Sequence, residues 1–220
     1  MAKAEKITRE KIILAFLESC FEKNAGGTSL SDVAGKLGIK KASLYNHYES
    51  RDAMLEDCIR WCGDYMKRAY FIPSDIDSIS KKYPAETVMK GIVNRWFKLN
   101  EKEPLCQVYS FIESEKYIST AAAEVSSENR TKLVTQTSVA LKSLSEAGKI
   151  VQLDENEAQY LSEMFASIVM NFLDSYIVNK KITIRSNPES GEGSLFAAPS
   201  DENSLNKIDE IVTNFCGLLK

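Results

Sequence analysis

The stretch from residue 28 to residue 55 reads TSLSDVAGKLGIKKASLYNHYESRDAML. Its first part has the pattern of a short helix, because Ser29 stands three residues before Asp32, the spacing of a capping box. Apolar residues then recur at intervals of three and four as far as Leu37, and Gly38 is suited to end the helix.

A second short helix is expected over residues 41–48, where Leu44 and Tyr48 lie one turn apart on the inward side. Its outer face carries lysine, serine, asparagine, histidine and a further tyrosine. A DNA major groove is about 12 Å wide and admits one helix, while the preceding helix crosses the backbone. Two short helices joined by a glycine turn meet this requirement.

Helices are also expected on both sides of this pair. Thr8 is a suitable N-cap for a helix that ends before the segment 24–27, which contains two glycines. Ser50 is a suitable cap for a longer helix over residues 51–70, with separate apolar and aromatic stripes. The start of the chain therefore predicts a small three-helix domain followed by a linking helix.

Helical periodicity continues through most of the remaining sequence. Residues 73–84 have no convincing period and are interpreted as a loop, and residues 183–204, rich in proline, glycine and serine, are expected to be a mobile loop. Helices are expected over the ranges 84–100, 105–115, 120–146, 155–180 and 205–219. No segment favours a sheet, so the fold class is all-α.

Composition narrows the function classes. Of the 220 residues 44% are hydrophobic and 27% are charged, as in ordinary soluble proteins. No uninterrupted apolar stretch approaches the roughly 20 residues of a membrane span, and the start does not look like a signal peptide, so a cytoplasmic protein with no membrane partner is expected. The net charge is −3, yet the chain through Arg51 has nine basic against six acidic residues, which leaves −6 for the rest. A basic end on an acidic body is typical of a protein that meets phosphates at one end.

Five cysteines, an odd number spread through helical segments, argue against a disulfide framework. Cys58 and Cys62 would lie one turn apart and are compatible with a metal or redox pair, or with simple core packing. Core packing is favoured, because the chain has one histidine and no second cysteine pair. We expect no metal site and no cofactor.

The motifs of residues 28–55 resemble, in order and without gaps, the helix-turn-helix signature of the TetR family of bacterial transcriptional regulators. The resemblance covers about the first quarter of the chain and rests on TSLSDVA, LGI, LYNHY and SRDAML. Two positions depart from the family pattern: Lys40 stands where a capping serine or threonine is common, and Ala42 replaces a frequent glycine. The first change removes a side-chain cap and adds a cation beside the DNA backbone.

The resemblance implies which side chains contact DNA. Candidates for base edges are Lys41, Ser43 and Asn46, since lysine binds guanine acceptors and asparagine pairs with adenine. Candidates for phosphate contacts are Thr28, Ser29, Lys40, Tyr45, His47 and Arg51. The alternative is that the basic residues form only a solvated face.

The resemblance also implies a division into a DNA-binding domain, residues 1–52, and a helical domain for ligand sensing and dimerisation, residues 53–220. The last two helices have stripes of the kind found in four-helix bundles, which predicts a homodimer interface at Leu161, Ile168, Phe172, Leu205, Ile208, Val212 and Phe215. The alternative is that both stripes face the core of a monomer. Candidate lining residues of a cavity for an unidentified small-molecule effector are Trp61, Tyr65, Trp96, Tyr109, Phe111, Met164, Phe165 and Met170.

These expectations describe a ligand-responsive regulator, of the repressing kind common in the family, on a near-palindromic double-stranded DNA operator. An activator of the same family and a helical protein-binding adaptor are the alternatives. An enzyme is disfavoured and no catalytic residue is assigned, because the chain lacks a P-loop, a dinucleotide-binding glycine motif, a nucleophile elbow and a histidine-rich metal motif.

Overall fold

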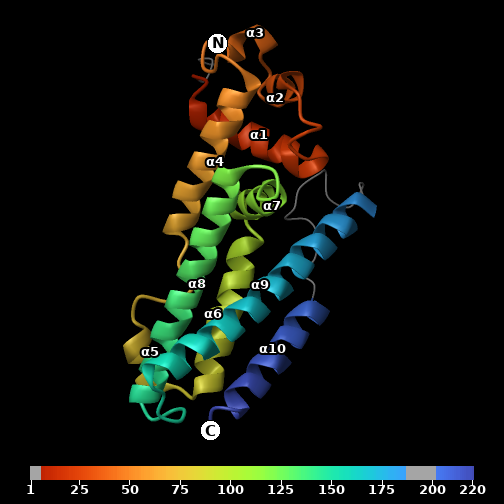
Figure 1. Cartoon of the computed structure of the whole chain (residues 1–220). Coiled ribbons are helices and arrows are strands. Elements are labelled where there is room, and N and C mark those ends of the chain that lie inside the picture. Colours follow the sequence, from red (N-terminus) through yellow and green to blue (C-terminus); the bar gives the residue numbers. More distant parts are fainter. Residues whose placement is uncertain (1–5, 187–201) are drawn as a thin grey trace. The chain divides into compact units, whose positions relative to one another are not determined.

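A computed structural model describes residues 6–186 and 202–220, and in this part of the chain the regular structure is helical, without a strand (Figure 1). The helices are α1 (Arg9–Lys23), α2 (Leu30–Lys36), α3 (Lys41–Leu44), α4 (Arg51–Arg68), α5 (Ile76–Lys82), α6 (Ala85–Asn100), α7 (Leu105–Glu115), α8 (Thr120–Glu146), α9 (Glu155–Ser186) and α10 (Glu202–Gly217). The all-α fold class is confirmed.

The chain forms two compact units. The first contains the residues up to Arg68 together with Pro104–Glu128, and thus α1 to α4, α7 and the start of α8. Within it, α7 contacts both α1 and α4, and Phe16 meets Phe111 edge to face with ring centroids 6.0 Å apart. This unit is larger than the domain over residues 1–52 expected from the sequence, because the apolar faces of α1 and α4 are completed by α7.

The second unit contains Ala69–Glu103 and Asn129–Lys220. In it α10 contacts α6 and α9, and α5 contacts α6. Large aromatic side chains fill its interior: Phe97 meets Tyr176 with centroids 5.4 Å apart, and Phe165 meets Phe215 at 4.7 Å. Burial of such side chains is the main stabilising contribution to a helical unit of this kind.

The structure differs from the sequence prediction in two loops. The segment expected as a loop at 73–84 contains α5, whose Ile76 is 5% exposed, and the contact of this helix with α6 compensates for its weak helical pattern. The expected mobile loop at 183–204 is shorter at both ends, since α9 continues to Ser186 and α10 begins at Glu202. Its middle, residues 187–201, lies outside the described residues.

Candidate DNA-binding site

The start of α2 is held by a capping box. The Ser29 hydroxyl accepts a hydrogen bond from the Asp32 backbone N–H (3.2 Å), and the Asp32 carboxylate accepts one from the Ser29 N–H (2.8 Å). Asp32 Oδ1 also lies 2.6 Å from Lys23 Nζ at the end of α1. The Lys23 ammonium and the Ser29 donors together hold the pKa of the Asp32 carboxyl well below its usual range. This confirms the predicted box and adds a tie between α1 and α2.

The turn between α2 and α3 depends on Gly38, which has a φ of +63°, a value that favours glycine. The Ile39 N–H then donates to Ala34 O at 3.0 Å, which closes the end of α2. Lys40 occupies the N-cap of α3 and makes no side-chain capping bond. The predicted loss of a side-chain cap is confirmed.

The end of α3 is anchored from two sides. Leu44 and Tyr48 are buried, and the Tyr48 hydroxyl donates to Asp57 Oδ2 on α4 at 2.7 Å. Burial and the adjacent carboxylate raise the pKa of the Tyr48 phenol. Arg9 of α1 donates to His47 O at 3.3 Å and lies 5.4 Å from the centroid of the Tyr48 ring. The short α3 is therefore held by the helix before the pair and the helix after it.

The outer surface of α3 and the following turn is polar and cationic. Lys40, Lys41 and Asn46 are exposed, and 52% of Tyr45 is exposed. Ser43 and His47 are half-buried at its margin. These six predicted residues occupy one short segment, residues 40–47.

The lysines of this segment differ from their neighbours in charge pairing. Lys23 pairs with Asp32, and Lys36 pairs with Glu18 and Glu22 at 2.8 Å each. In the described part of the chain, neither Lys40 nor Lys41 has an ion-pair partner. Their positive charge is consequently available to an external anion.

Three predicted phosphate contacts have structural roles instead. Thr28 is only 2% exposed, and its hydroxyl donates to Asn24 O at 2.7 Å. Arg51 donates through Nε to Thr28 O at 3.0 Å and through a terminal nitrogen to Ala25 O. The two side chains satisfy carbonyl groups of the loop between α1 and α2. Ser29 is exposed, but its hydroxyl proton goes to Asp32 Oδ2 at 2.7 Å.

Arg9 is the residue that sequence reasoning missed in this site. It acts on His47 across 38 residues of sequence, so no local spacing indicates the contact. Its basic character within the positively charged segment through Arg51 is the one signal present in the sequence.

The predicted effector-lining residues are divided between the two units. Four of them belong to the first unit and four to the second. Most have intramolecular partners: Trp61 stacks on Tyr65 with centroids 5.1 Å apart, and Trp96 meets Phe71 at 5.7 Å. Phe111 meets Phe16, and Phe165 meets Phe215. Tyr109 is buried, Met170 is half-buried, and Met164 is 57% exposed. None of the eight lines either of the two pockets described next.

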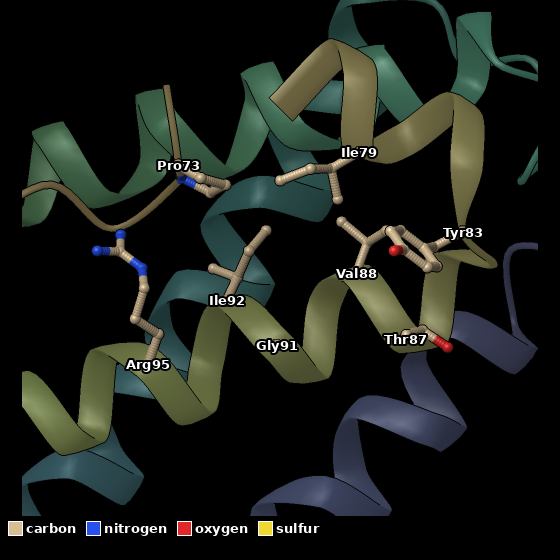
Figure 2. Close-up of a pocket in the computed structure, with 8 residues that line it drawn as sticks. All are labelled: Pro73, Ile79, Tyr83, Thr87, Val88, Gly91, Ile92 and Arg95. Carbon is tan, nitrogen blue, oxygen red and sulfur yellow. The ribbon is translucent and has the colours of Figure 1, made fainter. Parts of the chain in front are cut away.

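The second unit contains a groove of about 320 Å³ along α6, roofed by α5 (Figure 2). It is lined by Pro73, Ile79, Tyr83, Thr87, Val88, Gly91, Ile92 and Arg95. The first unit contains a more polar hollow of about 490 Å³ between α4 and the start of α8, with charged residues of both signs on its walls. The sequence did not indicate the groove, because its roof was interpreted as a loop.

The predicted dimer residues divide into two groups. Ile208, Val212 and Phe215 of α10 are buried within their own protomer, at 0%, 0% and 6% exposure, because α10 packs on α6 and α9. The stripe on α10 was therefore assigned to the wrong surface. Leu161, Ile168, Phe172 and Leu205 are half-exposed.

The five cysteines are buried, and burial raises the pKa of the Cys20 thiol to about 12 and that of Cys216 to about 11. Burial raises the pKa of the Cys58 thiol well above its usual value, and the neighbouring Cys62 adds to this shift. Among the described residues, no group of three or more His, Cys, Asp or Glu side chains has a geometry that could hold a metal ion.

By length and composition, one described helix, Glu155–Thr183, is apolar enough to cross a membrane, with a mean hydropathy of 1.2. Only 39% of its most apolar window is buried within the chain. Core helices of soluble proteins have the same length and composition, and the feature shows chiefly that α9 leaves apolar side chains exposed.

Known proteins similar to this chain include DNA-binding regulators. Residues 12–58 match the family described as bacterial regulatory proteins, tetR family. The biofilm operon icaADBC HTH-type negative transcriptional regulator IcaR of Staphylococcus aureus is 25% identical over 169 residues, 76% of this chain and 81% of IcaR. IcaR of Staphylococcus epidermidis is 32% identical over 75 residues, 32% of this chain and 40% of that protein.

Solved structures share the fold. A putative TetR-family regulator from Mesorhizobium loti has a TM-score of 0.60 at 14% identity, covering 96% of this chain and 95% of its own. A putative transcriptional regulator from Saccharomonospora viridis in complex with choline also has a TM-score of 0.60, at 10% identity and 94% coverage of both chains.

A helix-turn-helix with an exposed cationic second helix, joined to a helical second unit, defines a DNA-binding transcriptional regulator rather than an enzyme. The chain is similar to members of the TetR family of bacterial transcriptional regulators, through the family match over residues 12–58 and the likeness to IcaR over 76% of its length.

Proposed function

We propose that this protein is a repressor that binds a near-palindromic operator as a homodimer and is released from it by a small-molecule effector. The observation that carries the DNA half of this proposal is the unpaired positive charge of Lys40 and Lys41, on the outward segment 40–47. A cation with no internal partner gains most from a phosphate or a base acceptor.

Within this segment the roles follow from side-chain chemistry. Lys41, Ser43 and Asn46 meet base edges, with lysine on guanine O6 or N7 and asparagine bidentate on adenine. Lys40, Tyr45 and His47 meet phosphates, which set the register and supply salt-dependent affinity. Arg9, Arg51 and Thr28 hold the helices in position.

The dimer half of the proposal is supported by the outward face of α9. Tyr160 and Met164 are four residues apart, as are Val178 and Ile182 further along the helix, and all four are between 54% and 67% exposed. Half-exposed Ile168 lies between the two pairs. An apolar stripe of this length on a soluble protein marks an interaction surface. In a two-fold dimer it would pair with its own copy, and the two α3 segments would reach half-sites about 34 Å apart.

The names of similar proteins support repression and its release by a small molecule. IcaR is named as a negative regulator, and the Saccharomonospora viridis structure is of a regulator in complex with choline, a small molecule. Effector and operator would favour different conformers. By linkage, the operator then weakens effector binding by the same factor by which the effector weakens operator binding.

The test is the affinity of the purified full chain for DNA flanking its own gene, measured at two salt concentrations. Lys41→Ala should lower the affinity by roughly 5- to 150-fold, as expected for a base contact of about 1–3 kcal/mol, and Tyr45→Ala should lower it for all sequences alike. Lys98→Ala removes an exposed lysine from α6 of the second unit and is the matched control, which should bind as the wild type does.

Equal binding by wild type, Lys41→Ala and Tyr45→Ala would contradict the assigned surface. If the wild type selects no sequence from a random DNA pool, the proposal of an operator-binding repressor is wrong.

A further inference from the structure

The groove between α5 and α6 combines an apolar body with a single charged group. Pro73, Ile79, Val88 and Ile92 supply aliphatic walls, and Arg95 is the one charged residue among those that line it. In Figure 2 the Arg95 guanidinium lies beside Pro73 at one end of the groove, and Tyr83 lies at the other end. From Thr87 to Arg95 the helix rises about 12 Å, which is the length available to a ligand.

We propose that this groove binds an apolar monocarboxylate, with the carboxylate on Arg95 and the hydrocarbon body along Ile92 and Val88. The assignment deepens the proposed function, on which it rests, because it names the class of effector. A guanidinium presents five donors in a fork that matches a carboxylate, so the charge selects an anion while the aliphatic walls select its body. The volume of about 320 Å³ is that of a small-ligand site.

Gly91 gives an independent reason to read the groove as a binding site. It lies in the interior of α6, where glycine favours the helix less than alanine does. A Cβ built at this position meets no atom within 4 Å, so no neighbouring helix requires a glycine there. The missing side chain instead leaves the floor of the groove open.

Arg95 also connects the groove to the segment that follows α4. One terminal nitrogen of Arg95 donates to Tyr70 O at 2.6 Å and to Phe71 O at 2.8 Å. A carboxylate bound at the guanidinium would compete with these two carbonyl groups for the same donors. Ligand binding would then weaken the attachment of residues 70–71 to α6.

The same segment is held from α8. Gln136 Oε1 accepts hydrogen bonds from the backbone N–H groups of Phe71 (2.6 Å) and Ile72 (3.2 Å), and Lys132 donates to Ala69 O. Side chains of α6 and α8 thus hold the short segment between α4 and α5 by hydrogen bonds. Of these side chains, Arg95 lines the groove. This gives a carboxylate a direct effect on the chain that continues from α4.

Octanoate and 1-octanol are suitable probes, since they share a hydrocarbon chain and differ in charge. Their binding to the full chain is measured by calorimetry in the absence of DNA. The wild type should bind octanoate more tightly than octanol. Arg95→Gln, which keeps an amide donor for the carbonyl groups, should weaken octanoate by roughly 10- to 100-fold and leave octanol unchanged.

Gly91→Leu should abolish the binding of both probes by filling the groove, whereas Gly91→Ala should retain most of it. Arg130→Gln removes a guanidinium from α8 that donates to Ser167 and does not line the groove, and should leave both affinities unchanged. Octanoate should also speed the hydrogen exchange of the Phe71 and Ile72 amides in the wild type and not in Gly91→Leu.

Failure of octanoate to bind at millimolar concentration, or equal binding by Gly91→Leu, would overturn the site. Equal octanoate affinity in Arg95→Gln and wild type would overturn the role of the charge, and unchanged amide exchange would overturn the coupling. Because these measurements contain no DNA, they separate failure of the site from failure of the proposed repressor, which the operator titration decides.

Discussion

Single side chains set the geometry of the helix-turn-helix. Asp32 accepts hydrogen bonds from the Ser29 backbone, the Ser29 hydroxyl and Lys23. Arg51 and Thr28 close the loop before α2, and Arg9 holds the carbonyl of His47. Side chains of α1, α2 and α4 therefore fix the geometry of the helix pair.

Asp32 leads to a prediction about pH. Its pKa in the folded protein is depressed, so its stabilising contribution is fully present above the unfolded carboxyl pKa of about 4 and is lost as the pH falls below that value. Asp32→Asn should lower the urea midpoint of unfolding at pH 7. The difference in midpoint between the variant and the wild type should be smaller at pH 3. Asp52→Asn is the control, because the Asp52 side chain is 86% exposed and its carboxylate is 3.9 Å from Arg51. If the difference in midpoint between Asp32→Asn and the wild type does not change with pH, the Asp32 charge does not have the proposed role.

At the scale of elements, a close approach of two helices stabilises the first unit. Gly63 on α4 faces Val125 on α8, and a Cβ built on Gly63 would lie 3.0 Å from a methyl carbon of Val125. The missing side chain allows the two backbones to approach, a role different from that of Gly91, where the space is open. Glycine therefore permits close helix packing in α4, whereas in α6 it leaves open space.

Gly63→Leu should destabilise the protein by roughly 1–3 kcal/mol through overpacking, measured as a shift in the urea unfolding midpoint. The combination with Val125→Ala should recover part of this loss, because it removes the atoms that collide. Gly91→Leu is the comparison at an open helical position and should not destabilise. If the double variant is no more stable than Gly63→Leu alone, the collision is not the cause.

At the scale of the whole molecule, the exposed stripe of α9 sets the expected assembly. The stripe has apolar residues at 54–67% exposure, whereas α10 turns its most apolar residues to the interior of the protomer. The dimer surface should therefore consist mainly of α9, with α10 contributing at its edge. This differs from the even pairing of the last two helices expected from the sequence.

Met164→Glu should raise the dimer Kd at least tenfold, because a carboxylate would have to be buried opposite its own copy without a cation. Sedimentation equilibrium measures the Kd, and operator affinity should fall in parallel. Ile118→Glu introduces the same charge at a residue that is 83% exposed in the first unit, and should remain dimeric. An unchanged dimer in Met164→Glu would place the interface elsewhere.

The sequence by itself determined the features that depend on contacts within four or five residues. The caps at Thr8, Ser29 and Ser50, the glycine turn at Gly38 and the uncapped start of α3 are all confirmed. Each is a hydrogen bond or backbone conformation made by near neighbours, so residue type and spacing suffice to predict it. The same local pattern carried the family resemblance.

Only the tertiary structure decided which way an amphipathic face turns and which distant groups meet. Arg51 and Thr28 look like surface phosphate contacts until the carbonyl groups of the preceding loop are placed beside them. Val212 has the spacing of an interface residue and is buried at 0% exposure, because α6 and α9 cover it. Periodicity defines the apolar face of a helix but not what covers it, because burial depends on helices far apart in the chain. The groove beside Arg95 likewise forms only when α5 lies over α6.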